Sequence, residues 1–202
     1  MITKTQYILL DTLYDYYNKE LFEGKLNDCM ITTSRKKSAN GFFSPESWKK
    51  KSESNLNLHE ISINPDYLDR EDEEWQSTLV HEMVHLWQKD FGKPSRNNYH
   101  NREWGDKMES LGLMPSNTGK PDGKKTGQGM THYIISDGLF IKAFNRLSEK
   151  NIKYTSSLIP GGLAKASRAK TKYMCPCGNK VWGKPELIVI CGVCKNKFLQ
   201  AD

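Results

Sequence analysis

Two stretches of the chain place apolar side chains at the spacing of an α-helix. The first covers residues 5–23, and Gly24 after it is a typical helix stop. The second covers residues 75–89, and the acidic run at residues 69–74 suits the positive end of its helix dipole. We therefore predict two long helices, each with an apolar face. The apolar positions are Ile8, Leu9, Leu13, Tyr16, Tyr17 and Leu21 in the first helix, and Leu79, Met83, Leu86 and Trp87 in the second.

Shorter apolar segments predict a small set of strands. Before the second helix these are residues 29–33, 41–44 and 59–64, the last with alternating apolar and polar positions. The intervening sequence SWKKKSESN, residues 47–55, is almost entirely polar and predicts a loop. A further strand is expected at residues 131–135.

Two shorter helices are expected in the second half of the chain. One covers residues 101–111 and is closed by Gly112, and the other covers residues 139–147. The segment at residues 115–129 is rich in Gly, Lys, Asn and Pro, and therefore predicts a surface loop.

Length and composition restrict the class of protein. A chain of 202 residues can build one hydrophobic core and one small appendage. The apolar fraction is 37%, and no apolar run approaches the roughly 18 residues that a membrane span needs. The first residues carry acids and tyrosines where a secretory signal would be apolar. We therefore expect a soluble, cytoplasmic protein with no membrane partner.

The positive charge of the chain lies in its C-terminal part. The net charge is +6, but residues 1–141 contain 18 basic and 21 acidic side chains, which gives −3. Residues 142–202 contain 12 basic and three acidic side chains, which gives +9. A clustered positive surface suits a polyanion such as nucleic acid, although solvated lysines that only aid solubility would give the same count. We expect a main domain at residues 1–150, a basic linker at 151–170 and a small module at 171–202.

The second predicted helix contains TLVHEMVHLW, in which His81 and His85 lie four residues apart. Positions i and i+4 share one face of a helix, so both imidazoles can face one metal ion. Glu82 is turned by about 100° around the helix axis and can act as a base on a metal-bound water. The alternative is a core helix that tolerates two polar histidines, and the pattern favours the metal site over it.

A third metal ligand must come from elsewhere in the chain, because a catalytic zinc usually takes three protein ligands and one water. A metzincin would need Gly and His where this chain has Gln88 and Phe91, so that family is excluded. The remaining candidates are His100, 15 residues after His85, and Glu103 on the next predicted helix. A third neutral imidazole is an established catalytic arrangement, which favours His100.

Two further residues are weaker candidates for a role in the chemistry, and a third histidine is not a candidate. His132 and Tyr133 could reach the same cleft and stabilise an oxyanion, although each residue type more often packs or lies on the surface. His59 begins a predicted strand and is not expected to take part in the reaction.

Four of the five cysteines form a C-x-C pair and a C-x-x-C pair near the C-terminus. In a reducing compartment this pattern favours a metal over disulfides, and a Cys₄ zinc site is expected, with short strands around Trp182 and at residues 187–190. About 30 residues cannot bury enough apolar surface to fold alone, so the metal would supply the missing stability. The cysteines are Cys175, Cys177, Cys191 and Cys194, and the lysines that interleave with Trp182 and Phe198 as candidate nucleic-acid contacts are Lys180, Lys184, Lys195 and Lys197.

Several motifs of this chain occur together in one known family. They are LVHEMVHLW, the histidine of YHNREWGDKM, the upstream segments YDYYNKELFEGKL, GFF and EISINPDYL, and the YxCxCG form of the cysteine cluster. On these motifs the chain resembles the SprT-like zinc metallopeptidases, the family that includes Spartan, over most of its length except residues 115–172. The resemblance implies an α+β fold, with a compact zincin-like domain and a small C-terminal zinc ribbon. It also implies zinc ligands at His81, His85 and His100 and a catalytic acid/base at Glu82.

Two hypotheses about function follow. The first is a zinc-dependent endopeptidase with one catalytic and one structural Zn²⁺, associated with DNA and acting on DNA-bound or DNA-cross-linked proteins. Zinc would lower the pKa of its water to about 7, and Glu82 would pass the proton to the leaving amine. The second is a nucleic-acid-binding or regulatory zinc protein whose protease-like site is inactive. Replacing Glu82 by Gln should abolish proteolysis only if the first hypothesis holds.

Overall fold

The computed structural model describes residues 1–37, 39–96, 98–147, 154–157 and 171–201. The chain forms two compact units, Met1–Pro160 and Gly161–Asp202. The predicted basic linker at residues 151–170 lies outside the described residues except for positions 154–157.

The four helices predicted from the apolar pattern are confirmed, each with its ends within three residues of the expected ones. Helix α1 ends where Glu23 and Gly24 adopt left-handed conformations, with φ of 58° and 68°. The N–H of Gly24 then closes the last turn by donating to the carbonyl of Asn18 at 2.9 Å. The helices are α1 Ile2–Phe22, α2 Asp72–Phe91, α3 Arg102–Ser110 and α4 Leu139–Arg146, with a 3₁₀ turn at Pro65–Tyr67.

A three-stranded sheet follows α1, in the order β1-β3-β2. Strand β1 (Met30–Thr33) runs parallel to β3 (Glu53–Ile63), and β2 (Gly41–Lys50) runs antiparallel to β3. The loop predicted at residues 47–55 is wrong, because β2 and β3 continue through most of it as a hairpin that turns at residues 51–52. This part of β2 is exposed, so its side chains need no apolar alternation and the strand is held by backbone pairing.

A second, antiparallel pair of strands lies beyond α3. It joins β4 (Leu113–Ser116) to β5 (Thr131–Ile134), which confirms the strand expected near residues 131–135. The surface loop predicted to begin at residue 115 begins two residues later. The prediction missed β4 because the strand is short and contains Pro115, a residue type that is rare inside strands. Gly112 has a φ of +86° and lies very close to the backbone of Gly138. A Cβ added to Gly112 would lie only 2.6 Å from the Cα of Gly138.

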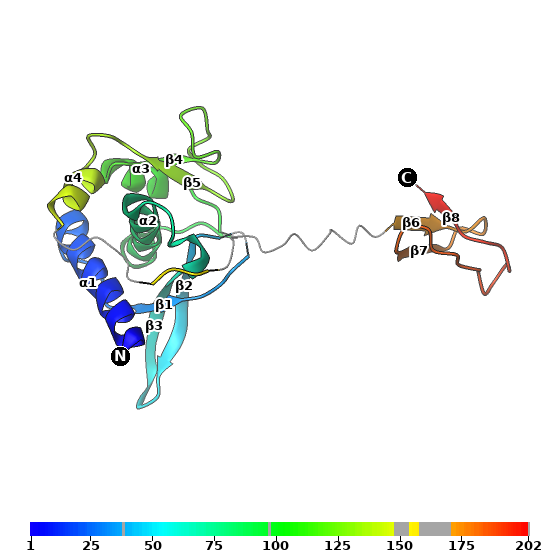
Figure 1. The fold of residues 1–202 in the computed structure, drawn as a ribbon, viewed down its shortest axis with the longest axis horizontal. Helices are drawn as coiled ribbons and strands as arrows, with labels where there is room; N and C mark the ends of the chain where they lie inside the picture. Colours follow the sequence, from blue (N-terminus) through cyan, green and yellow to red (C-terminus); the bar gives the residue numbers. More distant parts are fainter. Residues whose placement is uncertain (38, 97, 148–153, 158–170, 202) are drawn as a thin grey trace. The chain divides into compact units, whose positions relative to one another are not determined.

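Helix α2 lies at the centre of the first unit (Figure 1), between the three-stranded sheet on one side and α3 with the β4–β5 pair on another. Trp75, Leu79, Met83 and Leu86 are fully buried and anchor it in the core. The elements packed around α2 also bury polar side chains that would be exposed to solvent on a surface helix. These are Gln76, Ser77, Thr78, His81, Glu82 and Gln88. Buried polar groups need partners, so this set locates the candidate site.

The second unit is a small three-stranded sheet in the order β7-β6-β8, built from β6 Thr171–Met174, β7 Lys180–Gly183 and β8 Leu199–Ala201. Its buried core consists of Tyr173, Cys175, Cys191 and Phe198. The strand expected at residues 187–190 is wrong, since only Ile190 forms an isolated bridge, with Lys197. Among the described residues of both units, no helix has the length and apolar character to cross a membrane.

Candidate metal centre

Three histidines, two on α2 and one just before α3, converge in the first unit. His81 and His85 lie one turn apart on α2, and His100 precedes Asn101, the N-cap of α3. The Nε2 atoms of His85 and His100 are 3.0 Å apart, and one ring nitrogen from each histidine lies within 4.8 Å of the others. An ion with metal–nitrogen distances of about 2.1 Å separates tetrahedral ligands by roughly 3.4 Å. The three side chains therefore have the chemistry and the spacing of a metal-binding set.

The backbone of a distant loop holds His100 in place. His100 and Gly127 exchange two backbone hydrogen bonds, of 2.8 and 3.1 Å. The ring Nδ1 of His100 lies 3.2 Å from the carbonyl oxygen of Gly127. Because a carbonyl only accepts, Nδ1 must donate, which leaves the Nε2 lone pair of neutral His100 free to face the cluster.

Trp104 forms the floor under the three imidazoles. Its side chain is fully buried, and its ring centroid lies 4.3 Å from that of His100, 4.9 Å from His81 and 5.4 Å from His85. A rigid aromatic floor limits the rotamers that the histidines can adopt. It also covers one side of the cluster, and the cleft described next lies on another.

The histidines open into a cleft of about 640 Å³. Strand β2 forms one wall, and the segment before β5 forms another. From β2 and the segment before it, the lining residues are Lys36, Ala39, Asn40, Gly41, Phe42, Phe43 and Pro45. Helix α2 contributes His81, Glu82 and His85 among others. From β5 and the segment before it, the lining residues are Gly129, Met130, Thr131 and His132.

Burial keeps the imidazoles neutral. It lowers the pKa of His85 to about 3, with His100 adding to the effect. Burial also lowers the pKa of His81 well below its usual value, and the neighbouring His85, His132 and His100 lower it further. The pKa of His100 falls for the same first reason, loss of solvent. Neutral imidazoles with free lone pairs are the form that binds metals.

Glu82 lies beside the cluster with its side chain buried. Burial raises the pKa of Glu82 to about 8, whereas the charge of Lys36 and a hydrogen bond from the backbone of Phe43 act in the opposite direction. Gly41 makes room for this side chain, since a Cβ at that position would lie 3.4 Å from Glu82 Cγ and 3.1 Å from Thr78 Cγ2. Sequence patterns alone did not predict this role for Gly41.

Glu103, the rival third ligand, has other partners. Its Oε2 accepts hydrogen bonds of 2.7 Å from Gln88 Nε2 and from the backbone N–H of Lys93. These bonds join the end of α2 to the start of α3, and they lower the pKa of Glu103, the Lys93 bond having the largest effect. The structure thus brings His100, and not Glu103, to the pair on α2.

The structure separates the two residues weighed as oxyanion donors. His132 lines the cleft, but its Nδ1 lies 3.1 Å from His81 Nδ1 and its Nε2 lies 2.8 Å from Ser77 Oγ. Tyr133 is not among the described residues that line the cleft. Successive side chains on a strand point to opposite faces, which places the Tyr133 side chain on the face of β5 opposite to that of His132.

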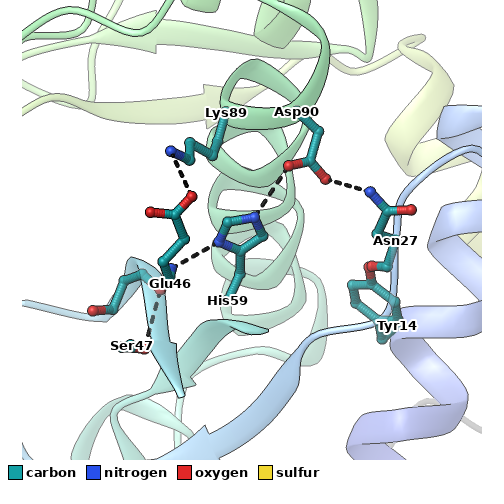
Figure 2. Close-up of polar contacts among 8 residues, drawn as sticks. Tyr14, Asn27, Glu46, Ser47, His59, Lys89 and Asp90 are labelled. Carbon is teal, nitrogen blue, oxygen red and sulfur yellow. Dashed lines mark hydrogen bonds and ion pairs between the residues drawn. The ribbon is translucent and has the colours of Figure 1, made fainter. Parts of the chain in front are cut away.

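A polar network ties the cleft wall to the end of α2, and it centres on His59, which lies inside β3 rather than at the start of a strand. Its Nδ1 accepts from the backbone N–H of Glu46 at 2.9 Å, and its Nε2 lies 3.1 Å from Asp90 Oδ1. Asn27 donates to the other oxygen of Asp90 at 2.9 Å, and Lys89 pairs with the Glu46 carboxylate (Figure 2). The register of β2 with β3 shifts between Ser44 and Trp48, and the network holds this irregular part of β2 near α2, which carries His81 and His85.

The four cysteines of the second unit form another metal-binding set, their sulfurs lying within 4.8 Å of one another. Cys175 and Cys194 sulfurs are 3.0 Å apart and Cys177 and Cys191 sulfurs 3.6 Å, which is longer than the roughly 2.05 Å of a disulfide. Hydrogen bonds from the backbone N–H groups of Cys194 and Val193 and from Asn179 lower the pKa of Cys191 to about 6. Such donors stabilise the thiolate that a metal requires.

The lysines predicted as nucleic-acid contacts all lie on the surface of the second unit. Trp182, on β7, leaves 59% of its surface exposed, whereas Phe198 is buried in the small core and is not available for stacking. The exposed lysines are Lys180, Lys184, Lys195 and Lys197.

Comparison with known proteins bears on the first unit. A model of the SprT-like family matches residues 10–122, which is more than half of the chain and includes the three histidines and Glu82. The match ends before β5 and does not reach the cysteine cluster. A search of curated proteins gave no significant match.

Proposed function

Because the chain belongs to the SprT-like family of metallopeptidase-like domains, we propose that it is a zinc-dependent endopeptidase with a zincin-like first unit. The observation that carries the proposal is the convergence of His81, His85 and His100 beside the carboxyl group of Glu82 in one open cleft. Three neutral nitrogen donors with a vacant side toward solvent are typical of a catalytic rather than a structural zinc.

The residues of the cleft divide the chemistry among them. His81, His85 and His100 would hold Zn²⁺, which when bound makes a water acidic near neutral pH and polarises a carbonyl group. Glu82 accepts the proton of the attacking water and returns it to the leaving amine. Burial favours the neutral form of Glu82 and raises its pKa to about 8, and Lys36 and the backbone N–H of Phe43 partly oppose burial by favouring the ionised form that the first of these steps needs.

Strand β2 supports an extended peptide as the substrate. It is an edge strand of its sheet, and its residues Gly41, Phe42 and Phe43 line the cleft. An edge strand offers unpaired backbone groups to which an extended chain can add as a further strand. Such binding is independent of side-chain identity, which suits an endopeptidase that acts on proteins.

The test of the enzyme proposal compares two isosteric substitutions. Glu82→Gln should retain zinc but lose proteolysis of protein substrates by about 100-fold or more, because the proton acceptor is gone. Glu71→Gln is the matched control, since Glu71 is the exposed N-cap residue of the same helix. Activity of Glu82→Gln equal to that of the wild type, with DNA both present and absent, would overturn the proposal.

We further propose that the second unit is a zinc ribbon, with one structural Zn²⁺, and that it brings the protein to DNA. The support is the charge of the second unit, residues 161–202, where eight basic and two acidic side chains give +6, together with four exposed lysines and exposed Trp182. The substrates would then be DNA-bound or DNA-cross-linked proteins in the cytoplasm, a step that rests on analogy with the family. The same surface also favours the second candidate, a nucleic-acid-binding or regulatory zinc protein with an inactive protease-like site.

Salt-dependent binding tests the association with DNA. Replacement of Lys180, Lys184, Lys195 and Lys197 by Glu should weaken binding to single- and double-stranded DNA and reduce the dependence of affinity on salt. The matched control replaces four exposed lysines of the first unit, Lys19, Lys49, Lys51 and Lys120, by Glu. Equal losses in the two variants would mean that overall charge, and not the second unit, governs binding.

A further inference from the structure

His132 has no place in the reaction proposed above, yet both of its ring nitrogens have partners on α2. It lies on β5, opposite Pro115 of β4. Its position in the chain is beyond residues 10–122, which match the family. Its Nδ1 is 3.1 Å from Nδ1 of His81, and its Nε2 is 2.8 Å from Oγ of Ser77. Ser77 lies one turn before His81 on α2 and donates to the carbonyl of Glu74 at 2.7 Å. These contacts form a continuous chain that ends at a candidate metal ligand.

The direction of each hydrogen bond in this chain follows from the first. A backbone carbonyl can only accept, so the single hydroxyl hydrogen of Ser77 goes to Glu74. Ser77 Oγ must then accept from His132, which places the hydrogen of neutral His132 on Nε2. Nδ1 of His132 is left with a lone pair, and it can pair with His81 only if His81 carries its hydrogen on Nδ1. The remaining nitrogen of His81, Nε2, then has a free lone pair.

We propose that His132 is a positioning residue that, with Ser77, holds His81 in the tautomer whose Nε2 can bind the metal. The proposal rests on the proposed zinc site. It assigns to His81 an arrangement like that of His100, whose Nδ1 faces the Gly127 carbonyl. The partner of His81 is unusual in being an uncharged imidazole, where metal-bound histidines more often face a carboxylate or a carbonyl. The chain of bonds takes both nitrogens of His132, so we no longer expect it to donate to an oxyanion.

The first measurement needs no substitution and no metal. Nitrogen-15 NMR of the zinc-free protein distinguishes the two neutral histidine tautomers. His81 should carry its hydrogen on Nδ1, and His132 should carry its hydrogen on Nε2. The opposite tautomer at either histidine would overturn the proposal. Ser77→Ala removes the group that sets the direction, and it should give a mixture of tautomers at both rings.

The second measurement is zinc affinity, followed through the imidazole signals of His85 and His100 so that the cysteine site does not contribute. His132→Leu should weaken binding by about 10- to 100-fold, the usual loss when the partner of a metal-bound histidine is removed. His132→Asn should recover part of this loss, because its amide oxygen can accept from His81 Nδ1. Ile134→Val, the conservative control on the same strand, should bind zinc as the wild type does, because Ile134 packs against the apolar core and does not line the cleft.

The outcomes separate this proposal from the one it rests on. Failure of the wild-type histidines to bind zinc would remove the proposed enzyme, whatever tautomer is found. Binding that is unchanged in His132→Leu would remove the role of His132 and leave the enzyme proposal intact. Loss of binding in both His132→Leu and His132→Asn, with the chain folded, would instead indicate that His132 is itself a ligand, and it would overturn the positioning role.

Discussion

The histidine site and the cysteine site offer metal ligands at similar spacing but are held by different means. His81 and His85 lie on α2 and His100 directly precedes α3, so a large core sets their positions, with Trp104 as the floor and Gly127 and His132 as polar partners. The cysteines lie in a unit whose buried apolar core has four members, two of which are cysteines themselves. The first site is thus prepared by the fold, whereas in the second the ligands are a large part of the fold.

The donor sets also differ in charge. Three neutral imidazoles would leave the two positive charges of a zinc ion uncompensated, which favours binding and polarising a fourth, oxygen ligand. Four thiolates would overcompensate that charge and complete a tetrahedron, which closes the site to substrate. One arrangement suits catalysis and the other suits stability, and each of the following predictions tests this contrast.

Removal of all metal should have the largest effect, and it should fall on one unit only. Exhaustive chelation should unfold the second unit, because about 10–16 kcal/mol of zinc binding is typical of small structural sites and can exceed what such a core supplies. The first unit should keep its fold. Amide NMR signals of residues 171–201 should collapse to narrow dispersion while those of the first unit stay in place. Loss of both sets of signals would show that the histidine site is also required for folding.

Removal of single ligands should separate the two sites. His100→Ala should lower the zinc affinity of the histidine site by more than about 100-fold, a greater loss than that from an outer partner. It should leave the cysteine site filled, so that the metal content falls from two zinc ions per chain to one. Cys191→Ser should give the converse result. Glu103→Ala is the informative control, because its carboxylate bonds to Gln88 and Lys93 and not to the cluster. Zinc lost in Glu103→Ala but retained in His100→Ala would reverse the ligand assignment.

The contrast also explains which features could be predicted from sequence. His81 and His85 are related by helical periodicity, and the cysteine pairs by short spacing, so both sets are visible locally. The outer half of the β2–β3 hairpin was missed because its exposed residues carry no apolar alternation. The link from Ser77 through His132 to His81 joins positions more than 50 residues apart and depends on the packing of β5 against α2. No local pattern encodes such a contact.

Gly41→Ala should affect catalysis without removing the metal. The new Cβ would meet Ser62 O at 3.0 Å, Thr78 Cγ2 at 3.1 Å and Glu82 Cγ at 3.4 Å. The backbone of β3 cannot yield easily, so Glu82 should be displaced by part of an ångström. We expect kcat to fall by up to about 100-fold with zinc affinity unchanged. Gly192→Ala, whose Cβ has no neighbour within 4 Å, is the control and should be silent. A fall in the zinc affinity of Gly41→Ala as large as the fall in its kcat would show that β2 supports the metal ligands and not only Glu82.

The smallest predicted effect tests whether the polar network around His59 and Asp90 stabilises the wall of the cleft in the first unit. Asp90→Ala removes the carboxylate that bonds His59 of β3 and Asn27 before β1, and so releases both segments from the end of α2. The His59 and Asp90 side chains are only 13% and 12% exposed. The substitution should therefore lower the free energy of unfolding by about 1–3 kcal/mol. Hydrogen exchange should show it locally, as faster exchange of the paired amides between Trp48 and Leu58. Asp106→Ala breaks the exposed pair with Arg102 and should cost less than about 0.5 kcal/mol. If the two variants behave alike, the network around His59 does not stabilise the cleft wall, and the preparation of the site rests on the apolar core alone.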